Sequence, residues 1–340
     1  MPGIAPDLVV RLCRAEGLTH LATIDIPPAF DPAGLERMLA DGIGDLAWIE
    51  AERGLRLRPA GMLPTARSVL CVAWHYFPGA PSSSSASGNA SSLRRAAYAA
   101  GKDYHGILRP KLGRIGQALN AACGQPWNHR ACVDSAPLNE RTLARLAGLG
   151  WLGRNALLIS PDTGSYRLLG FLLTEAPLEP APGGHGEDRC GRCTRCETAC
   201  PTGALTGRRC LTERCISYLT IEHQGVIPRD LAAKFNGWWF GCDLCQEVCP
   251  WNRFAPPGED ARLAGSDHEA DLLALTADRF DLHFAARAIR RLTWPRFRRN
   301  LLVALWSLGR LDEARQVCAE DLELVRAQAV ELGLACNTTA

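Results

Sequence analysis

Two short runs of cysteines carry the clearest chemistry in this sequence. The first run has the spacing C-x2-C-x2-C-x3-C-P over residues 190–201, and the second has the spacing C-x2-C-x3-C-P over residues 242–250. Bacterial ferredoxins use the first spacing, with three thiolates on one [4Fe–4S] cube and the fourth on a second cube. The spacing therefore predicts iron–sulfur clusters.

The number of ligands indicates two clusters rather than one. One cube needs four thiolates and would leave three clustered cysteines unused, whereas two cubes need eight and the two runs supply seven. The eighth must lie between the runs, where Cys210 and Cys215 are both candidates. Crosswise ligation then gives one cube Cys190, Cys193, Cys196 and Cys249, and the other cube Cys200, Cys242, Cys245 and one intermediate cysteine.

Structural zinc is the alternative metal, since Zn²⁺ also binds paired C-x2-C units. Three cysteines at C-x2-C-x2-C are crowded around one tetrahedral ion, however, and both runs end in the Cys-Pro pair of ferredoxins. Two clusters form an electron pathway, yet the sequence has neither a G-x-G-x-x-G fingerprint after a strand nor a G-K-[ST] phosphate loop. The electron acceptor is therefore external or occupies a pocket without a sequence signature.

The composition indicates a protein that works away from membranes. The chain has 340 residues, 47% of them hydrophobic, and a net charge of only +2, so any nucleic-acid binding must come from a local patch. The first apolar run is short and is interrupted by Arg11 and Arg14, unlike a signal peptide. No run reaches the roughly 20 apolar residues of a membrane helix. We expect a cytoplasmic monomer.

The elements that must position the cysteines fall into three regions. Residues 1–180 alternate between helical and strand patterns, with strands at 20–26 and 66–77, a helix at 104–123 and a hairpin at 156–175. A Pro/Gly-rich linker leads into the cysteine-rich region, and helical periodicity returns near the C-terminus. The predicted fold class is therefore α+β multi-domain: an α/β domain at 1–180, a ferredoxin-like domain at 181–257 and an α-helical repeat at 258–340.

Four segments together closely resemble the epoxyqueuosine reductase family: VDSAPLNERTLARLAGLGWLGRN, CGRCTRCETACPTGAL, CISYLTIEHQGVIP and GCDLCQEVCPWN. The resemblance covers about residues 20–310. It implies reduction of epoxyqueuosine to queuosine at the wobble position of tRNA, within an anticodon stem-loop. It also implies base-off cobalamin in the α/β domain, two [4Fe–4S] clusters, an external low-potential electron donor and a HEAT-like C-terminal repeat. Of the two intermediate cysteines, the resemblance selects Cys215.

The same resemblance assigns roles to individual residues. Asp134, in the segment VDSAP, matches the proton donor of the family, and we expect a buried apolar setting that raises its pKa. Without the resemblance, Asp134 would be a turn or helix-capping residue. The resemblance further implies cobalamin contacts from Arg58, Asp134, Asn155, Leu158, Ser217 and His223. His105 is not assigned as a cobalt ligand, because no D-x-H-x-x-G sequence occurs.

A basic segment near the C-terminus supplies the expected tRNA signal. Arginines interleave with aromatic residues here, which suits phosphates and splayed bases: Arg287, Arg290, Arg291, Arg296, Arg298 and Arg299, with Trp294 and Phe297. Two other functions remain open at this stage. One is a cobalamin enzyme like the reductive dehalogenases that acts on a small molecule, and the other is a two-cluster electron-transfer protein that binds neither corrin nor tRNA.

Overall fold

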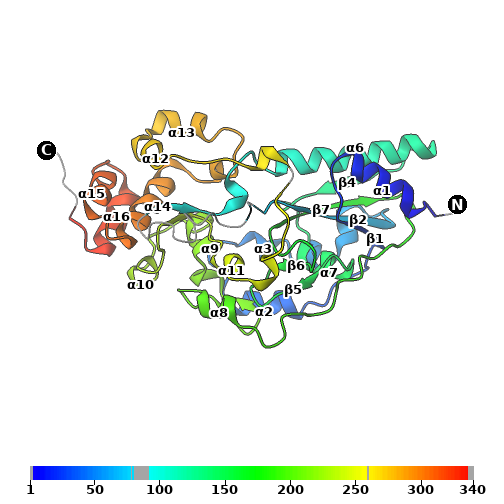
Figure 1. Cartoon of the computed structure of the whole chain (residues 1–340), viewed down its shortest axis with the longest axis horizontal. Helices are drawn as coiled ribbons and strands as arrows, with labels where there is room; N and C mark the ends of the chain where they lie inside the picture. The colour runs from blue at the N-terminus through cyan, green and yellow to red at the C-terminus, as the bar shows by residue number, and fades with distance from the viewer. Residues whose placement is uncertain (1–2, 78, 80–91, 259, 336–340) are drawn as a thin grey trace.

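The computed structural model describes residues 3–77, 79, 92–258 and 260–335. The molecule is elongated, with a β-sheet and its helices at the N-terminal end and a group of helices at the C-terminal end (Figure 1). The cysteine-rich segment lies between them. No helix among the described residues is long and apolar enough to span a membrane.

A four-stranded antiparallel sheet forms the core of the N-terminal region, in the order β1 (Leu21–Asp25), β2 (Ser68–His75), β7 (Arg167–Thr174), β4 (His129–Cys132). All eight residues of β2 are buried, and they alternate between two hydrophobic clusters. Leu70 and Val72 pack with α1 (Pro6–Ala15) and α6 (His105–Cys123), whereas Val69 and Cys71 pack with α7 (Glu140–Leu146). The strands predicted at 20–26 and 66–77 and the helix at 104–123 are confirmed.

The predicted hairpin at 156–175 is wrong. Its first half, β6 (Leu158–Ile159), pairs instead with β5 (Trp151–Leu152). Its second half, β7, lies between β2 and β4 and pairs with both. Two apolar runs in sequence resemble a hairpin, but β7 is buried along most of its length and gains more by pairing on both edges than by folding back on a two-residue strand.

Short elements connect these parts of the chain. The segment after β1 contains α2 (Ala33–Asp41), α3 (Trp48–Ala51), α4 (Arg53–Leu57) and a 3₁₀ turn at Pro59–Met62. The cysteine-rich segment contains α8 (Arg195–Ala199), β8 (Leu205–Thr206), β9 (Arg209–Cys210), α9 (Ile216–Ile221), α10 (Arg229–Ala232), β10 (Trp238–Phe240) and α11 (Leu244–Glu247). A short parallel pairing of β10 with β3 (Arg94–Arg95) joins the two regions.

The C-terminal helices share one hydrophobic core with the cysteine-rich segment. They are α12 (Glu269–Ala274), α13 (Ala277–His283), α14 (Trp294–Ser307), α15 (Leu311–Cys318) and α16 (Glu323–Leu332). Trp239 of β10 packs against Phe284 and Phe297 at ring-centroid distances of 6.2 and 5.6 Å. Residues from α9 to α16 belong to this single cluster, so the helices fix the position of the segment that carries the later cysteines.

The predicted tRNA-contacting face of this region is wrong in part. Arg296, Arg298, Arg299 and Phe297 are buried in or beside the core. Arg299 donates to the carbonyl oxygens of Leu219, His223 and Gly225 at 3.0, 2.8 and 2.6 Å. The acceptors lie about 75 to 80 residues earlier in the chain, so a basic amphipathic reading of the sequence could not reveal them. Of the six arginines, Arg290 and Arg291 are exposed.

Replacing the buried Arg299 should destabilise the fold. We expect Arg299→Met to lower the free energy of unfolding by about 3 kcal/mol, because several buried carbonyl oxygens would lose a charged donor. Arg290→Met is the matched control: its ion pair with Asp281 is exposed, so it should change stability by less than about 1 kcal/mol. Anaerobic denaturant titration followed by circular dichroism measures both, and equal midpoints for the two variants would contradict the prediction.

Candidate active site

A cavity of about 300 Å³ lies among the cysteines of the second predicted ligand set. Its walls include Cys200, Cys242 and Cys245 together with both intermediate candidates, Cys210 and Cys215. In the described part of the chain, no three Cys, His, Asp or Glu side chains converge closely enough to hold a single metal ion. Thiols arranged around a cavity suit a polynuclear cluster better than one tetrahedral ion.

The cysteines of the first predicted set also lie together. Burial, and then the neighbouring thiols of Cys190, Cys196 and Cys193, raise the pKa of Cys249 to about 11. Trp151 Nε1 donates to Cys190 Sγ at 3.4 Å. The two sets are neighbours, because Cys196 contributes to the raised pKa of Cys245, as do Cys242 and Cys215 of its own set. The structure therefore groups the cysteines of the two runs crosswise.

A buried carboxyl group fixes the turn that carries Cys242 and Cys245. Asp243 lies between them and accepts hydrogen bonds from Ala97 N at 2.7 Å and from Gln246 Nε2 at 2.8 Å. Burial raises the pKa of Asp243 to about 6. Because Ala97 follows β3, this contact connects the later cysteine run to the N-terminal region.

The cavity continues from the cysteines toward the α/β region, where Asn155 and Ser217 also line it. Asn155 is 4% exposed, and its Nδ2 group has no hydrogen-bond partner among the described residues, while its Oδ1 accepts from Leu157 N at 3.2 Å. An unpaired buried donor is costly unless a bound molecule satisfies it. The cavity therefore has a donor that suits a ligand with amide or other acceptor groups, such as the side chains of a corrin.

Asp134 occupies a different setting from the one expected. Its side chain is 52% exposed, and its Oδ2 lies 3.1 Å from His105 Nε2. Burial opposes ionisation, but the hydrogen bond and charge of His105, together with the charge of Arg291, lower the pKa of Asp134. The predicted buried apolar site with a raised pKa is therefore wrong, because a cationic partner 29 residues earlier stabilises the carboxylate.

Two tyrosines, the buried Tyr104 and the partly buried Tyr98, lie between Asp134 and the cysteine cavity. Tyr104 lies close enough to the Asp134 carboxylate to help lower its pKa, and its ring meets that of Tyr98 edge-on at 6.1 Å. Tyr98 in turn lines the cavity together with Cys242 and Cys245. Neighbouring side chains thus lead without a break from the partly exposed carboxylate to the cavity that the thiols line.

The loop that carries Asp134 is held in an unusual conformation. Asp134 has φ of 49°, which is uncommon for a residue other than glycine. Its backbone N–H donates to Glu140 Oε1 at 2.6 Å, and Arg109 donates to Ser135 Oγ at 2.8 Å and, at 3.4 Å, to the carbonyl oxygen of Val133. Burial, and then the charge of Asp134, raise the pKa of Glu140 to about 8.

The other predicted cobalamin contacts divide into those near the cavity and those away from it. Leu158 is buried in the core of the α/β region, and the neighbouring Leu157 lines the cavity instead. His223 pairs with Asp45 at 2.8 Å and with the carbonyl oxygen of Val226, outside the cavity lining. Arg58 is exposed at the end of α4.

Known proteins match both halves of this arrangement. Residues 56–135 match the family described as epoxyqueuosine reductase QueG, DUF1730, and residues 189–252 match the 4Fe-4S double cluster binding domain. An epoxyqueuosine reductase from Vibrio cholerae is 38% identical over 299 residues, which cover 85% of this chain and 79% of that protein. The chain belongs to the epoxyqueuosine reductase family. The family's enzyme from Escherichia coli is 38% identical over 77% of this chain and 70% of its own length.

Solved structures of epoxyqueuosine reductases have the same mixed α/β fold. One superposes with a TM-score of 0.82 at 27% identity, covering 95% of this chain and 88% of that chain. Another, with an epoxyqueuosine-modified tRNA stem loop, has a TM-score of 0.81 at 26% identity over 96% of this chain and 89% of that chain. A third, from Bacillus subtilis, has its aspartate-bearing catalytic loop swung out of the active site, with a TM-score of 0.78 at 27% identity over 95% of this chain and 88% of that chain.

The sequence alone missed the partners of Asp134. Asp103 and His105 lie two residues apart, on either side of Tyr104, in the segment KDYH, which is the signal that could have suggested a carboxylate–histidine pair. Glu140 follows Asp134 by six residues in VDSAPLNE, where it resembles the first-turn acid of a helix. Both roles depend on the loop folding back on itself, which residue spacing does not reveal.

The hydrogen bond from Asp134 N to Glu140 should stabilise the loop in this conformation. Since the raised pKa keeps Glu140 largely protonated at pH 7, Glu140→Gln should preserve the bond, whereas Glu140→Leu should remove it. We expect amide exchange across residues 133–138 to become about tenfold faster in Glu140→Leu and to change little in Glu140→Gln. Hydrogen-exchange mass spectrometry measures this, and unchanged exchange in Glu140→Leu would contradict the prediction.

Proposed function

We propose that this protein reduces epoxyqueuosine to queuosine at the wobble position of tRNA, using cobalamin supplied with electrons by two [4Fe–4S] clusters. The observation that carries the proposal is the continuous region that joins the cysteine-lined cavity, through Tyr98 and Tyr104, to Asp134. Membership of the epoxyqueuosine reductase family, over most of the chain, supplies the substrate. The tRNA stem loop bound to a relative supports the same class of partner.

Different residues of the chain have different roles in this reaction. Base-off cobalamin, when bound, supplies a reduced cobalt centre that delivers two electrons for removal of the epoxide oxygen. Asn155 and Ser217 line the cavity and would hold the corrin through its polar groups. Asp134 delivers protons to the departing oxygen, so that oxygen leaves as water rather than as a strong base. The other predicted corrin contacts do not line this cavity: Arg58, Leu158 and His223. Any contact that they make with the corrin would lie outside it.

The clusters are assigned to the two groups of cysteines. Cys190, Cys193, Cys196 and Cys249 hold one cube, and Cys200, Cys215, Cys242 and Cys245 hold the other. We further propose three domains: residues 1–180 bind cobalamin, residues 181–257 form the ferredoxin-like unit, and residues 258–340 form a HEAT-like repeat that contacts tRNA. An external low-potential donor supplies electrons to this cytoplasmic monomer.

Direct assay tests the proposal. Anaerobically reconstituted protein with cobalamin and a low-potential chemical reductant should convert an epoxyqueuosine-containing anticodon stem-loop to the queuosine form, as nucleoside mass spectrometry measures. A halogenated aromatic substrate serves as the control for dehalogenase-like chemistry. Fully loaded protein that leaves the epoxide intact would refute the proposal, and failure to bind cobalamin would favour a pure electron carrier.

Removing the acid at position 134 should slow the reaction without disturbing the cofactors. We expect Asp134→Asn to lower turnover by roughly 100- to 10,000-fold, the usual contribution of a general acid. Cluster absorbance and the corrin spectrum should remain as in the wild type. Asp162→Asn is the matched control, since Asp162 is an exposed carboxylate that pairs with His185. Wild-type turnover in Asp134→Asn would contradict the assignment.

The two intermediate cysteines provide a matched pair for the ligand assignment. Cys210 and Cys215 line the same cavity, both are partly buried, and each thiol shifts the pKa of the other, so they lie close together. We expect Cys215→Ala to retain about four iron atoms per chain and Cys210→Ala to retain about eight, because two cubes hold eight. Iron and sulfide analysis decides between them, and the opposite result would make Cys210 the ligand.

A further inference from the structure

Three side chains from two segments form a hydrogen-bonded chain that ends at Asp134. Asp103 Oδ1 lies 2.6 Å from His105 Nδ1, and His105 Nε2 lies 3.1 Å from Asp134 Oδ2. The imidazole is held firmly, since Asp103 also accepts from His105 N at 3.0 Å and the ring of Tyr104 stacks on it at 4.1 Å. His105 thus bridges two carboxylates in a fixed orientation.

The charges around His105 determine where the proton of this chain rests. Burial opposes protonation, but the hydrogen bonds to Asp103 and Asp134 outweigh it and raise the pKa of His105 to about 9. The pKa values of both carboxyl groups are lowered, in large part by the hydrogen bonds to the same imidazole. The other charged or titratable groups that interact with these residues include Arg109, Arg291 and Glu140, together with Tyr98 and Tyr104. At neutral pH the proton rests on His105, and Asp134 is ionised.

An ionised Asp134 cannot by itself supply the two protons that removal of an epoxide oxygen consumes. We propose that His105 is the proton reservoir of the active site and recharges Asp134 during each turnover. This inference rests on the proposed function, and it adds a positioning residue that passes protons through Asp134 rather than touching the substrate. Asp103 accepts the Nδ1 hydrogen bond and keeps the Nε2–H directed at Asp134.

Each transfer balances in a simple way. The His105 Nε2–H bond breaks as an O–H bond forms on Asp134, and that O–H bond then breaks as the departing oxygen of the substrate gains the proton. Neutral His105 regains a proton from solvent, and a second round releases the oxygen as water. The external low-potential donor would supply the two electrons, and solvent supplies the two protons.

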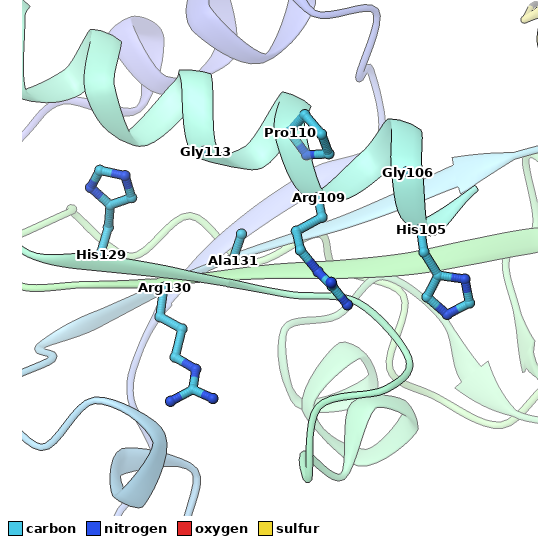
Figure 2. A pocket seen from close by; sticks show the side chains of 8 residues that line it. All are labelled: His105, Gly106, Arg109, Pro110, Gly113, His129, Arg130 and Ala131. Carbon is cyan, nitrogen blue, oxygen red and sulfur yellow. The ribbon is translucent and has the colours of Figure 1, made fainter. Parts of the chain in front are cut away.

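The route to solvent is visible beside His105. A groove of about 600 Å³ runs along α6 and β4, and Figure 2 shows His105 at one end of it, with Arg109, Arg130 and His129 farther along. The side chain of His105 therefore has contact with Asp134 and with an open groove that admits water. A residue in this position can reload from bulk water while the substrate covers Asp134.

The pH dependence of turnover tests the reservoir. In the wild type, kcat/KM should stay constant below about pH 9 and fall above it, because the reaction needs a proton on the His105–Asp134 pair. His105→Gln keeps a hydrogen-bonding side chain but cannot titrate, so turnover should fall about 100-fold and the decline near pH 9 should disappear. His129→Gln, in the same groove but outside the hydrogen-bonded chain, should retain both the rate and the decline.

Two further measurements separate this role from a structural one. Imidazole added to His105→Gly should restore turnover, and ¹⁵N NMR of the wild-type imidazoles should place one pKa near 9 that falls in Asp103→Asn. Wild-type rate and pH profile in His105→Gln would overturn the inference while leaving the proposed function intact. If wild-type protein loaded with its cofactors does not reduce the epoxide, the proposed function itself is overturned. The NMR titration needs no turnover, so its result is independent of that outcome.

Discussion

A buried polar network in the C-terminal core fixes both segments that carry the later cysteines. Arg299 donates to the carbonyl oxygen of Leu219 at 3.0 Å, and Asn300 Nδ2 donates to that of Thr220 at 2.6 Å. The Thr220 hydroxyl in turn accepts from Gly241 N at 2.9 Å, next to Cys242. Because these groups are buried and paired with one another, displacing any of them would leave polar atoms unsatisfied. The helices therefore act as the rigid support of the cysteine cavity.

This support explains why the basic segment could be misread. Arginine and aromatic residues in RLTWPRFRRN have the composition of a nucleic-acid surface, but Arg299 and Phe297 face inward. The acceptors that make a buried guanidinium tolerable are backbone carbonyl oxygens from α9 and the segment that follows it, and a carbonyl group carries no sequence signal. Burial, and then the charge of Arg296, lower the pKa of Arg299 to about 9. The lowered pKa reflects the cost of placing a charged group in the protein interior. Only the three-dimensional pairing shows that it is accommodated.

The sequence could predict features that depend on residues close together in the chain, but not those that depend on contacts between distant residues. The cysteine spacing, the double-sided burial of β2 and the length of α6 are local patterns, and the structure contains all three features. The partner of β7 and the ionisation of Asp134 depend on contacts between distant residues. For Asp134 the decisive neighbour, His105, lies 29 residues earlier, so the charge could be deduced only once β4 and the start of α6 were side by side.

The loop that carries Asp134 and the neighbouring His105 together fix the position of one carboxylate. Asp134 with φ of 49° is held by Glu140 at its backbone and by His105 at its side chain, so its carboxylate has a fixed orientation. In the structure of a relative from Bacillus subtilis, the aspartate-bearing catalytic loop is swung out of the active site. In this protein, a protonated Glu140 favours the observed loop conformation, because it accepts from Asp134 N without adding a second negative charge beside Asp134. The stability of this loop conformation therefore depends on the protonation of Glu140.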